Sequence, residues 1–234
     1  DDDVKGLSVQ IGSQSRDLSS LSGVSYLERD SKIVTSMPLF KGKNEIRNPY
    51  GGYIWIKRSG EASSGVVSLR IQGAYAAPDY KLGETDAAEW IEKIKATTVP
   101  WIELRGKQIV FSVPVQYMKL KAQSDGQNYV NRLEEALALW DDWVLCYHEF
   151  YGLDGAEPET FPRPDFPVRA VMDAHLLTER YSYISDTNIE LLRTEELIDM
   201  IADPDQIKMS AQNTAHVIGW MQQKMFDQTY WPSE

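Results

Sequence analysis

The stretches TDAAEWIEKIKA (85–96) and KQIVFSVPV (107–115) place a helix and a strand close together in the sequence. In the first stretch, Thr85 is suited to cap a helix, and Ala88, Ile91 and Ile94 fall along one helical face. The second stretch is rich in β-branched and aromatic residues, which is typical of a strand. The two patterns together indicate a mixed fold, in which sheet and helices share a core.

The sequence before residue 118 is rich in strand patterns. VKGLSVQIG (4–12) and YIWIKRS (53–59) alternate between apolar and polar residues, as half-buried strands do. GVVSLRIQGAY (65–75) predicts a further strand, and NPYGG (48–52) predicts a turn. We therefore expect residues 1–118 to form a β-rich subdomain.

The longest helical pattern is DGQNYVNRLEEALALWDDWVLCYHEFYGL (125–153), which is expected to end near Gly152 and Gly155. Its apolar residues recur at steps of three and four, so they form one stripe that has to be covered by other parts of the fold. The stripe consists of Tyr129, Leu133, Leu137, Trp140, Val144 and Tyr147.

Shorter elements follow the Pro-rich segment after this helix. VRAVMDAHLL (168–177) predicts a strand, and RTEELIDMIA (193–202) predicts a short helix that Thr194 can cap. A last helix is expected over residues 208–226. The fold class that we predict is α+β, with residues 119–234 as a helical subdomain.

Composition excludes several functional classes. The 234 residues carry a formal net charge of −11, which disfavours binding to nucleic acid or to anionic membranes. No apolar run is long enough to cross a bilayer, and the single Cys146 cannot form an internal disulfide bond. The ends, DDDVKGL and TYWPSE, have the character of cut edges, so we expect a segment of a longer chain or assembly.

Three local patterns resemble metal sites only in part. His148 and Glu149 begin a sequence like that of zinc peptidases, but the fifth residue is Gly152 rather than a second His. His175 stands alone in a predicted strand. At His216 the five residues read HVIGW (216–220). Valine cannot take a proton from water and an indole offers no lone pair for zinc, so His216 taken alone is expected to be structural.

The order of motifs along the chain resembles the enhancin-like, mucin-targeting zinc metallopeptidases and their vertebrate relatives, the channel-associated factors. The resemblance covers nearly the whole chain. It is carried by NPYGGYIWIK (48–57), by GVVSLRIQGAYAAPDYKLGETDAAEWIEKIKATTVPWIELRGKQIVFSVP (65–114), by LALWDDWVLCYHEFYGL (137–153) and by FPRPDFPVRAVMD (161–173).

This resemblance implies that the helical part is the start of a zincin-like, gluzincin subdomain. Its first zinc ligand falls on His216, and its third, eighteen residues later, falls on Glu234. The general base falls on Val217 and the second His ligand on Trp220. We therefore expect weak or absent zinc binding and no catalytic residue, because two protein ligands are fewer than the usual three.

The function expected is that of a secreted or cell-surface pseudoenzyme, a non-catalytic peptidase-like domain. It would bind a glycoprotein, a glycan or a protein partner through the former substrate cleft, with Trp220, Tyr181 and Tyr183 as contact residues. Two alternatives remain open. The chain could be an active zinc metallopeptidase that cleaves mucin-type glycoproteins with an atypical site, or a structural module of a larger assembly.

The glycine- and proline-containing segment 152–167 is the predicted weak point for limited proteolysis, because exposed polar segments between regular elements are cut first. A protease of broad specificity should therefore release two fragments that separate within this segment. The measurement is mass spectrometry of the earliest fragments. Early cleavage between residues 129 and 147 would contradict the predicted helix.

Overall fold

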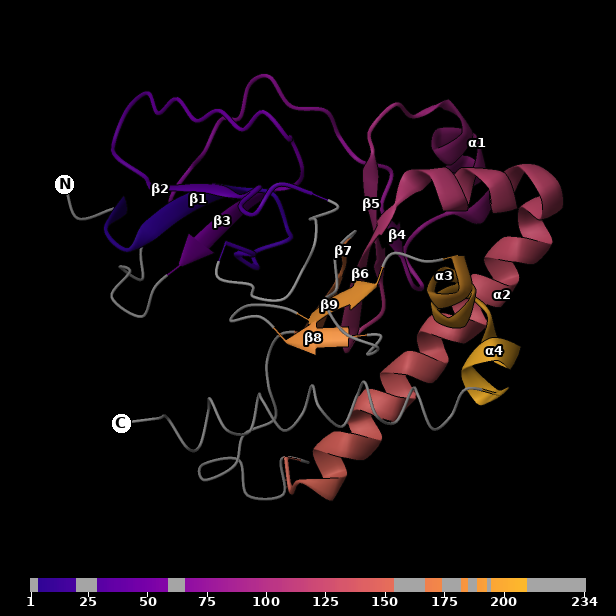
Figure 1. The fold of residues 1–234 in the computed structure, drawn as a ribbon. Coiled ribbons are helices and arrows are strands. Elements are labelled where there is room, and N and C mark those ends of the chain that lie inside the picture. The colour runs from indigo at the N-terminus through magenta and orange to yellow at the C-terminus, as the bar shows by residue number, and fades with distance from the viewer. Residues whose placement is uncertain are drawn as a thin grey trace. The chain divides into compact units, whose positions relative to one another are not determined.

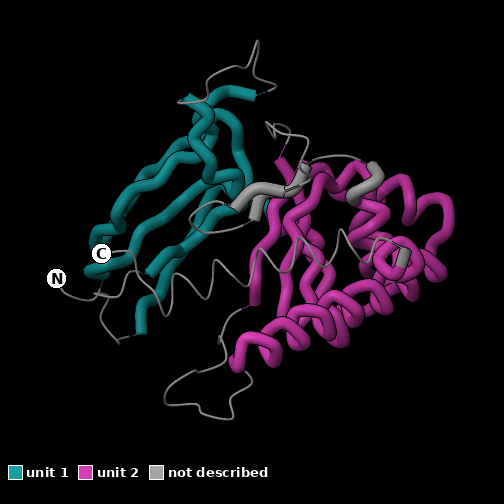
Figure 2. The backbone as a smooth tube through the Cα atoms, turned by 60° about the horizontal axis from the view of Figure 1, so that its bottom comes forward, with its two compact units in different colours: residues 1–76 teal, residues 77–234 magenta. Residues whose placement is uncertain are grey.

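The computed structural model of the chain describes residues 4–19, 29–58, 66–153, 167–173, 182–184, 189–192 and 195–209. It contains two compact units, Asp1–Ala76 and Ala77–Glu234, shown in different colours in Figure 2. Sheets and helices are both present, so the predicted α+β class is confirmed. Strands from the predicted β-rich part, residues 1–118, occur in both units. The predicted boundary between two subdomains at residue 118 stays a prediction.

The first unit contains a three-stranded antiparallel sheet in the order β2-β1-β3 (Figure 1). Its strands are β1 (Leu7–Ile11), β2 (Thr35–Pro38) and β3 (Ile54–Arg58). The predicted strands at 4–12 and 53–59 are confirmed as β1 and β3, whereas β2 has a four-residue sequence that gave no strand signal.

The predicted turn at residues 48–52 holds two parts of this unit together. The Asn48 side-chain amide donates to the carbonyl oxygens of Ile11 (2.9 Å) and Ile33 (2.8 Å). Gly52 has a φ of 109°, and a Cβ there would lie 2.8 Å from the Cα of Gly12. The turn therefore requires glycine at 52, both for its backbone conformation and for this close approach.

The strand predicted at residues 65–75 is not formed, and this prediction is wrong. Residues 66–72 are neither strand, helix nor turn, and Ser68 to Ala76 are all exposed. The sequence pattern reports a preference for pleated, half-buried surroundings. A strand also needs a partner, and no described strand pairs with this segment.

The second unit contains a six-stranded mixed sheet in the order β4-β5-β6-β7-β9-β8. Its strands are β4 (Tyr80–Lys81), β5 (Trp101–Arg105), β6 (Ile109–Pro114), β7 (Val168–Asp173), β8 (Ser182–Ile184) and β9 (Ile189–Leu192). β6, β7 and β9 run parallel, while β8 is antiparallel to β9. The predicted strands at 107–115 and 168–177 correspond to β6 and β7. Figure 1 shows the helices of this unit on one side of the sheet.

Helix α1 (Ala87–Ala96) confirms the first predicted helix but changes two of its details. Asp86 caps it, accepting a hydrogen bond from the Glu89 backbone N–H at 2.8 Å. The predicted cap, Thr85, instead accepts from the backbone N–H of Lys81. The buried face consists of Trp90, Ile91 and Ile94, and Ala88 is exposed.

Helix α2 (Val115–Phe150) contains the long predicted helix and begins ten residues before it. It bends at Gly126, whose φ of 51° and ψ of −121° are not helical. The predicted stripe is buried from Tyr129 to Val144, and Tyr147 is half-buried. The helix ends where expected, because Gly152 has a φ of 73° and its N–H bonds to the carbonyl of Glu149.

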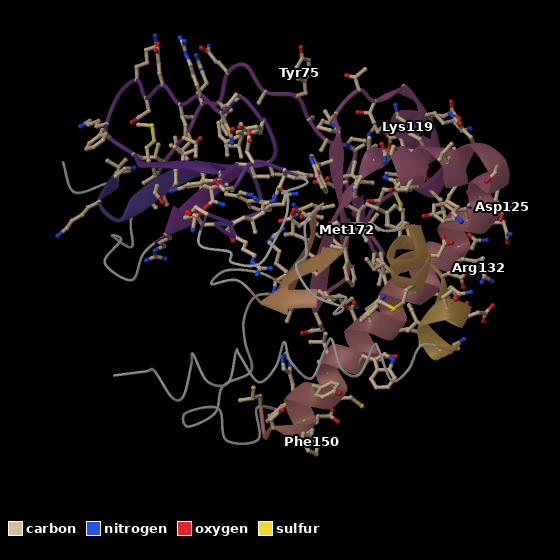
Figure 3. The ribbon with its side chains drawn as sticks, in the orientation of Figure 1. Tyr75, Lys119, Asp125, Arg132, Phe150 and Met172 are labelled. Atoms are coloured by element: carbon tan, nitrogen blue, oxygen red, sulfur yellow. The ribbon has the colours of Figure 1, made fainter. Side chains whose placement is uncertain are left out.

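Two short helices, α3 (Glu195–Ala202) and α4 (Pro204–Met209), pack against α2. The Trp140 indole donates to the carbonyl of Ile201 at 3.1 Å, and Arg132 pairs with Asp203 at 2.5 Å. Figure 3 shows Arg132 on the side of α2 next to α4. The predicted helix at 193–202 is thereby confirmed as α3, and most of the helix predicted at 208–226 lies outside the described residues.

The main hydrophobic core of the described residues lies in the second unit. Its apolar side chains come from one face of the six-stranded sheet and from the helices α1, α2, α3 and α4. Phe111 of β6 meets Trp140 of α2 edge to face, with ring centroids 5.2 Å apart. Among the described residues of the first unit, only Val9, Leu18 and Leu39 are buried apolar side chains.

Asp141 of α2 holds the hairpin between β5 and β6. Its two carboxylate oxygens accept the backbone N–H groups of Lys107 and Gln108, each at 2.7 Å. A Cβ added to Gly106 would lie 2.4 Å from one of these oxygens. The hairpin therefore needs a carboxylate at 141 and glycine at 106, because the two positions fill one small space.

Asp141→Ala should lower the free energy of unfolding by about 3 kcal/mol, because two hydrogen bonds to a buried charged group are lost. Gly106→Ala should cost about 1–3 kcal/mol through overpacking against the carboxylate. In the Asp141→Ala background, Gly106→Ala should cost almost nothing, since the obstructing oxygen is gone.

The measurement is urea unfolding of the two single variants and the double variant. Asp142→Ala is the matched control, because Asp142 is exposed and its loss should change stability by less than about 0.5 kcal/mol. Equal costs of Gly106→Ala in both backgrounds would contradict the contact with Asp141.

Candidate functional site

The elements predicted to border the cleft are only partly described. β7 is present as expected, and Tyr183 lies in β8, opposite Glu190 of β9. The structure therefore places one of the predicted contact residues on the last strand of the sheet. The other predicted site residues, Tyr181, His216, Val217, Trp220 and Glu234, lie outside the described residues, and the structure neither gathers nor separates them.

β8 forms one edge of the six-stranded sheet. Within the described ranges it pairs on one side only, with β9, and Figure 1 shows it at the end of the sheet. An antiparallel edge strand presents a row of backbone N–H and C=O groups that an extended peptide can join as a further strand. This edge can therefore recognise a polypeptide by its backbone, without any catalytic group.

β7 supports this edge from the interior of the sheet. It lies between β6 and β9, parallel to both. Ala170 and Met172 belong to the core on the helical side of the sheet, and Met172 is labelled in Figure 3. Val171 and Asp173 are also buried, so both faces of the strand are covered. A strand enclosed in this way fixes the position of the β9–β8 pair beside it.

A buried polar network crosses the sheet from β5 to β7. Glu103 of β5 is fully buried, and its carboxylate contacts Arg105 at 2.5 Å through Oε2 and Arg169 of β7 through Oε1. The Ser112 hydroxyl on β6 donates to Oε1 at 3.3 Å. Asp79 accepts the backbone N–H of Glu103 at 2.8 Å. Two carboxylates and two guanidinium groups are thus brought together, and their formal charges balance.

This network positions strands and does not supply an acid or a base. Both oxygens of Glu103 are engaged by cations, so the group has no oxygen directed at a substrate. Removing one partner from such a buried pair leaves a charge without compensation, which is strongly unfavourable. Arg169 therefore ties β7 to β5 across the intervening β6.

Sequence reasoning did not find this network. The usable signal was Glu103 between Ile102 and Leu104, an acidic residue within an otherwise apolar strand pattern. Its partners Arg105 and Arg169 are separated from each other by the whole of α2, so no local motif connects them.

Of the two other partial histidine patterns, only His148 lies within the described residues. His148 lies buried on α2, two residues before that helix ends, and His175 is outside the described residues. Within the ranges that the structure describes, no group of three or more His, Cys, Asp or Glu side chains could hold a metal ion. No helix in this part of the chain is long and apolar enough to span a membrane.

Two family profiles match the sequence and together cover most of it. The profile described as "Peptidase M60, enhancin and enhancin-like" matches residues 73–195. The profile described as "N-terminal domain of M60-like peptidases" matches residues 1–72. They meet close to Ala76, where the chain divides into its two compact units.

Curated relatives are similar over a large part of this chain. A TRPM8 channel-associated factor homolog of Xenopus laevis is 29% identical over 69% of the chain. TRPM8 channel-associated factor 1 of Bos taurus is 31% identical over 73%, and factor 2 of Homo sapiens is 26% identical over 94%. The chain spans only 16–21% of the length of these relatives.

Solved structures share the fold at low sequence identity. A Bacillus anthracis protein of unknown function has a TM-score of 0.65 at 15% identity, over 97% of this chain and 42% of that one. The M60 catalytic domain of Clostridium perfringens ZmpC, in complex with the sialyl T antigen, has a TM-score of 0.61 at 16% identity, over 84% and 39%. A metallopeptidase in complex with Tn antigen has a TM-score of 0.57 at 20% identity, over 95% and 39%.

The first profile alone covers residues 73–195, more than half of the chain, and the solved structures share the fold. The chain therefore belongs to the enhancin and enhancin-like M60 peptidase family.

Proposed function

We propose that this chain is a non-catalytic peptidase-like domain that binds a glycoprotein, a glycan or a protein partner through the former substrate cleft. The observation that carries the proposal is β8, an antiparallel edge strand in the sheet of a peptidase fold. Such an edge retains its capacity to pair with an extended peptide when the catalytic residues have been replaced.

The donor set at the expected metal position does not fit catalytic zinc. By the resemblance, His216 and Glu234 supply two ligands, whereas catalytic zinc sites use three protein ligands and a water. Trp220 cannot be the third, because an indole N–H donates and has no lone pair for a metal. Val217 cannot accept a proton from water, so a general base is missing as well. Metal-dependent hydrolysis by this chain is therefore not part of the proposed function.

The names of the relatives support a binding role. The curated relatives are channel-associated factors, which supports a protein partner. Two solved structures of the same fold are complexes with sialyl T antigen and Tn antigen, which supports a glycan at the cleft. A location outside the cell or at its surface belongs to the same proposal, because glycoproteins of this type are found there.

Zinc titration tests the non-catalytic part of the proposal. Wild type should bind zinc weakly. Trp220→His should tighten zinc binding at least about tenfold, because it adds an imidazole four residues after His216, which is one turn away in the predicted helix 208–226. Trp220→Ala is the matched control, since it removes the same indole without adding a donor. Hydrolysis of a mucin-type glycopeptide should require Val217→Glu in addition to Trp220→His, because the attacking water otherwise lacks a base.

Stoichiometric, tight zinc in wild type, together with chelator-sensitive hydrolysis of the glycopeptide, would refute the proposal. That result would assign the chain to the active metallopeptidases instead.

Binding of the same glycopeptide separates a partner-binding domain from a structural module. The wild-type protein should bind it by isothermal titration calorimetry. Tyr183→Ala and Tyr181→Ala should each weaken binding by about five- to tenfold, as expected for loss of an aromatic contact residue. Tyr50→Ala, at an exposed tyrosine in the turn 48–52 of the first unit, is a control for the general loss of a tyrosine. An absence of binding to both the glycosylated and the unglycosylated peptide would favour the structural module.

A further inference from the structure

The segment from Val66 to Tyr75 has a strand-like sequence and lies exposed. Val66 is 98% exposed and Tyr75 is 86% exposed, and Leu69 and Ile71 are exposed as well. Figure 3 shows the Tyr75 side chain standing clear of the ribbon. Scattered apolar side chains are normal on a surface, but a continuous group of them marks an interaction site.

The backbone of this segment is available for pairing. Within the described part of the chain, residues 66–76 take part in no backbone hydrogen bond and in no strand ladder. Residues 66–72 form no turn or bend. The segment therefore offers the row of donors and acceptors that an edge strand offers to an additional strand.

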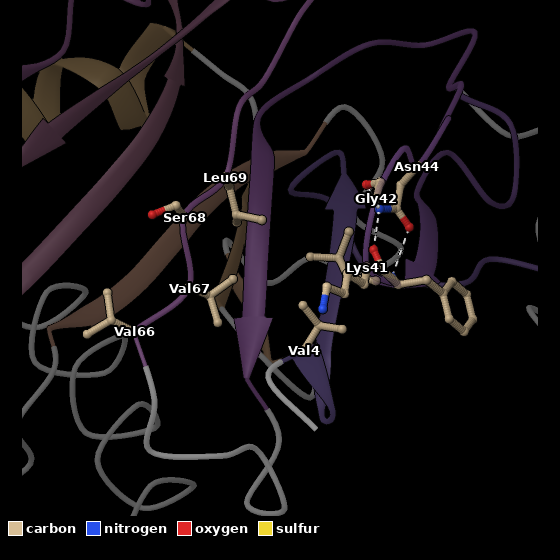
Figure 4. A pocket seen from close by; sticks show the side chains of 10 residues that line it. Val4, Lys41, Gly42, Asn44, Val66, Val67, Ser68 and Leu69 are labelled. Carbon is tan, nitrogen blue, oxygen red and sulfur yellow. Dashed lines mark hydrogen bonds between the residues drawn. The ribbon is translucent and has the colours of Figure 1, made fainter. Parts of the chain in front are cut away.

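A pocket of about 220 Å³ lies beside the first residues of this segment (Figure 4). It is smaller than a typical site for a small-molecule ligand, at about 300–1,000 Å³, so its size suits one side chain. Val66, Val67 and Leu69 line one side, and Val4 and Leu39 contribute further apolar atoms. An apolar side chain is therefore the natural occupant of this pocket.

The loop on the other side of the pocket is held in shape by its own hydrogen bonds. The Asn44 side chain accepts from the backbone N–H of Phe40 at 2.9 Å and donates to the Phe40 carbonyl at 2.7 Å and the Gly42 carbonyl at 3.1 Å. Figure 4 shows Gly42 and Asn44 on the opposite side of the pocket from Val66 and Val67. A loop closed in this way needs little reorganisation when a ligand binds.

The charges beside the pocket are positive. Lys5 follows the lining residue Val4, and Arg70 follows Leu69. Both cations are exposed, and neither forms an ion pair within the described ranges. The acidic Glu45 is paired with Lys43 at 2.5 Å. Residues 1–76 carry ten Lys and Arg against eight Asp and Glu, whereas the chain as a whole is acidic.

We propose that residues 66–72 and the adjacent pocket form a docking site for an extended strand of a protein partner with alternating acidic and apolar side chains. The partner strand pairs with the unbonded backbone, places an apolar side chain in the pocket, and brings carboxylates to Lys5 and Arg70. A second copy of this chain fits less well, because like charges would then face each other across paired strands.

The probe is a labelled peptide, acetyl-EVEIEVE-amide, with acetyl-KVKIKVK-amide as its charge-reversed counterpart. Fluorescence anisotropy should show binding of the acidic peptide by the wild-type chain and at least about tenfold weaker binding of the basic one. Arg70→Glu should weaken the acidic peptide and strengthen the basic one. Lys93→Glu on α1 is the matched control and should leave both affinities unchanged.

Two proline variants test backbone pairing. Successive residues of a strand direct their N–H groups to opposite edges, and Ile71 and Gln72 do not line the pocket. Either Ile71→Pro or Gln72→Pro should therefore weaken binding by at least about tenfold, and the other should not. Neither change removes a hydrogen bond of the folded protein, so the thermal midpoint should stay unchanged.

Hydrogen exchange supplies the independent readout. The amides of residues 67–71 should exchange rapidly in the chain alone and slow down when the acidic peptide is added. Protection in the chain alone at low concentration, equal affinity for the two peptides, or two proline variants without effect would each overturn the proposal. Protection that increases with protein concentration would assign the surface to a second copy and overturn it as well.

Discussion

The carboxylate of Asp141 connects the long helix to the sheet, and much of the second unit depends on that connection. It accepts two backbone N–H groups from the turn between β5 and β6. The neighbouring Trp140 packs on Phe111 of β6 and bonds to Ile201 of α3. Of these two consecutive residues of α2, Asp141 therefore holds the β5–β6 hairpin and Trp140 holds α3. A shift of one residue along the helix would break both connections at once.

Glu103 performs a related task within the sheet itself. It lies on β5, opposite Ser112 of β6, and it reaches Arg169 of β7. β6 and β7 pair in parallel, although α2 and the segment after it separate them in the sequence. Bringing the two strands together therefore costs the entropy of closing this long connection. A charge-compensated link from β5 to β7 gives that pairing a fixed register. The proposed binding cleft depends on the β9–β8 pair, and β9 pairs directly with β7.

How much could be predicted from the sequence depended on how local the determining interactions are. The long helix was predictable because Tyr129 to Val144 recur with helical spacing, and its end because of Gly152. The cap of α1 was misassigned because Thr85 and Asp86 are both good caps, and only the geometry shows that Asp86 bonds to Glu89. The strand predicted at 65–75 is not formed, because a preference of the residues for strand structure does not supply a neighbouring strand to pair with. Glu103 and Arg169 were missed because their contact joins positions far apart in the sequence.

The residues that hold the fold together are different from those expected to carry catalysis. The interactions that hold the second unit together use Glu103, Asp141 and Trp140, all of which precede the metal motif in the sequence. None of these three residues is among the expected ligands. The replacements that the resemblance implies at Val217 and Trp220 therefore leave these anchors intact. In the proposed function, the sheet keeps its edge strand while the catalytic residues are replaced, and partner binding is the role that remains.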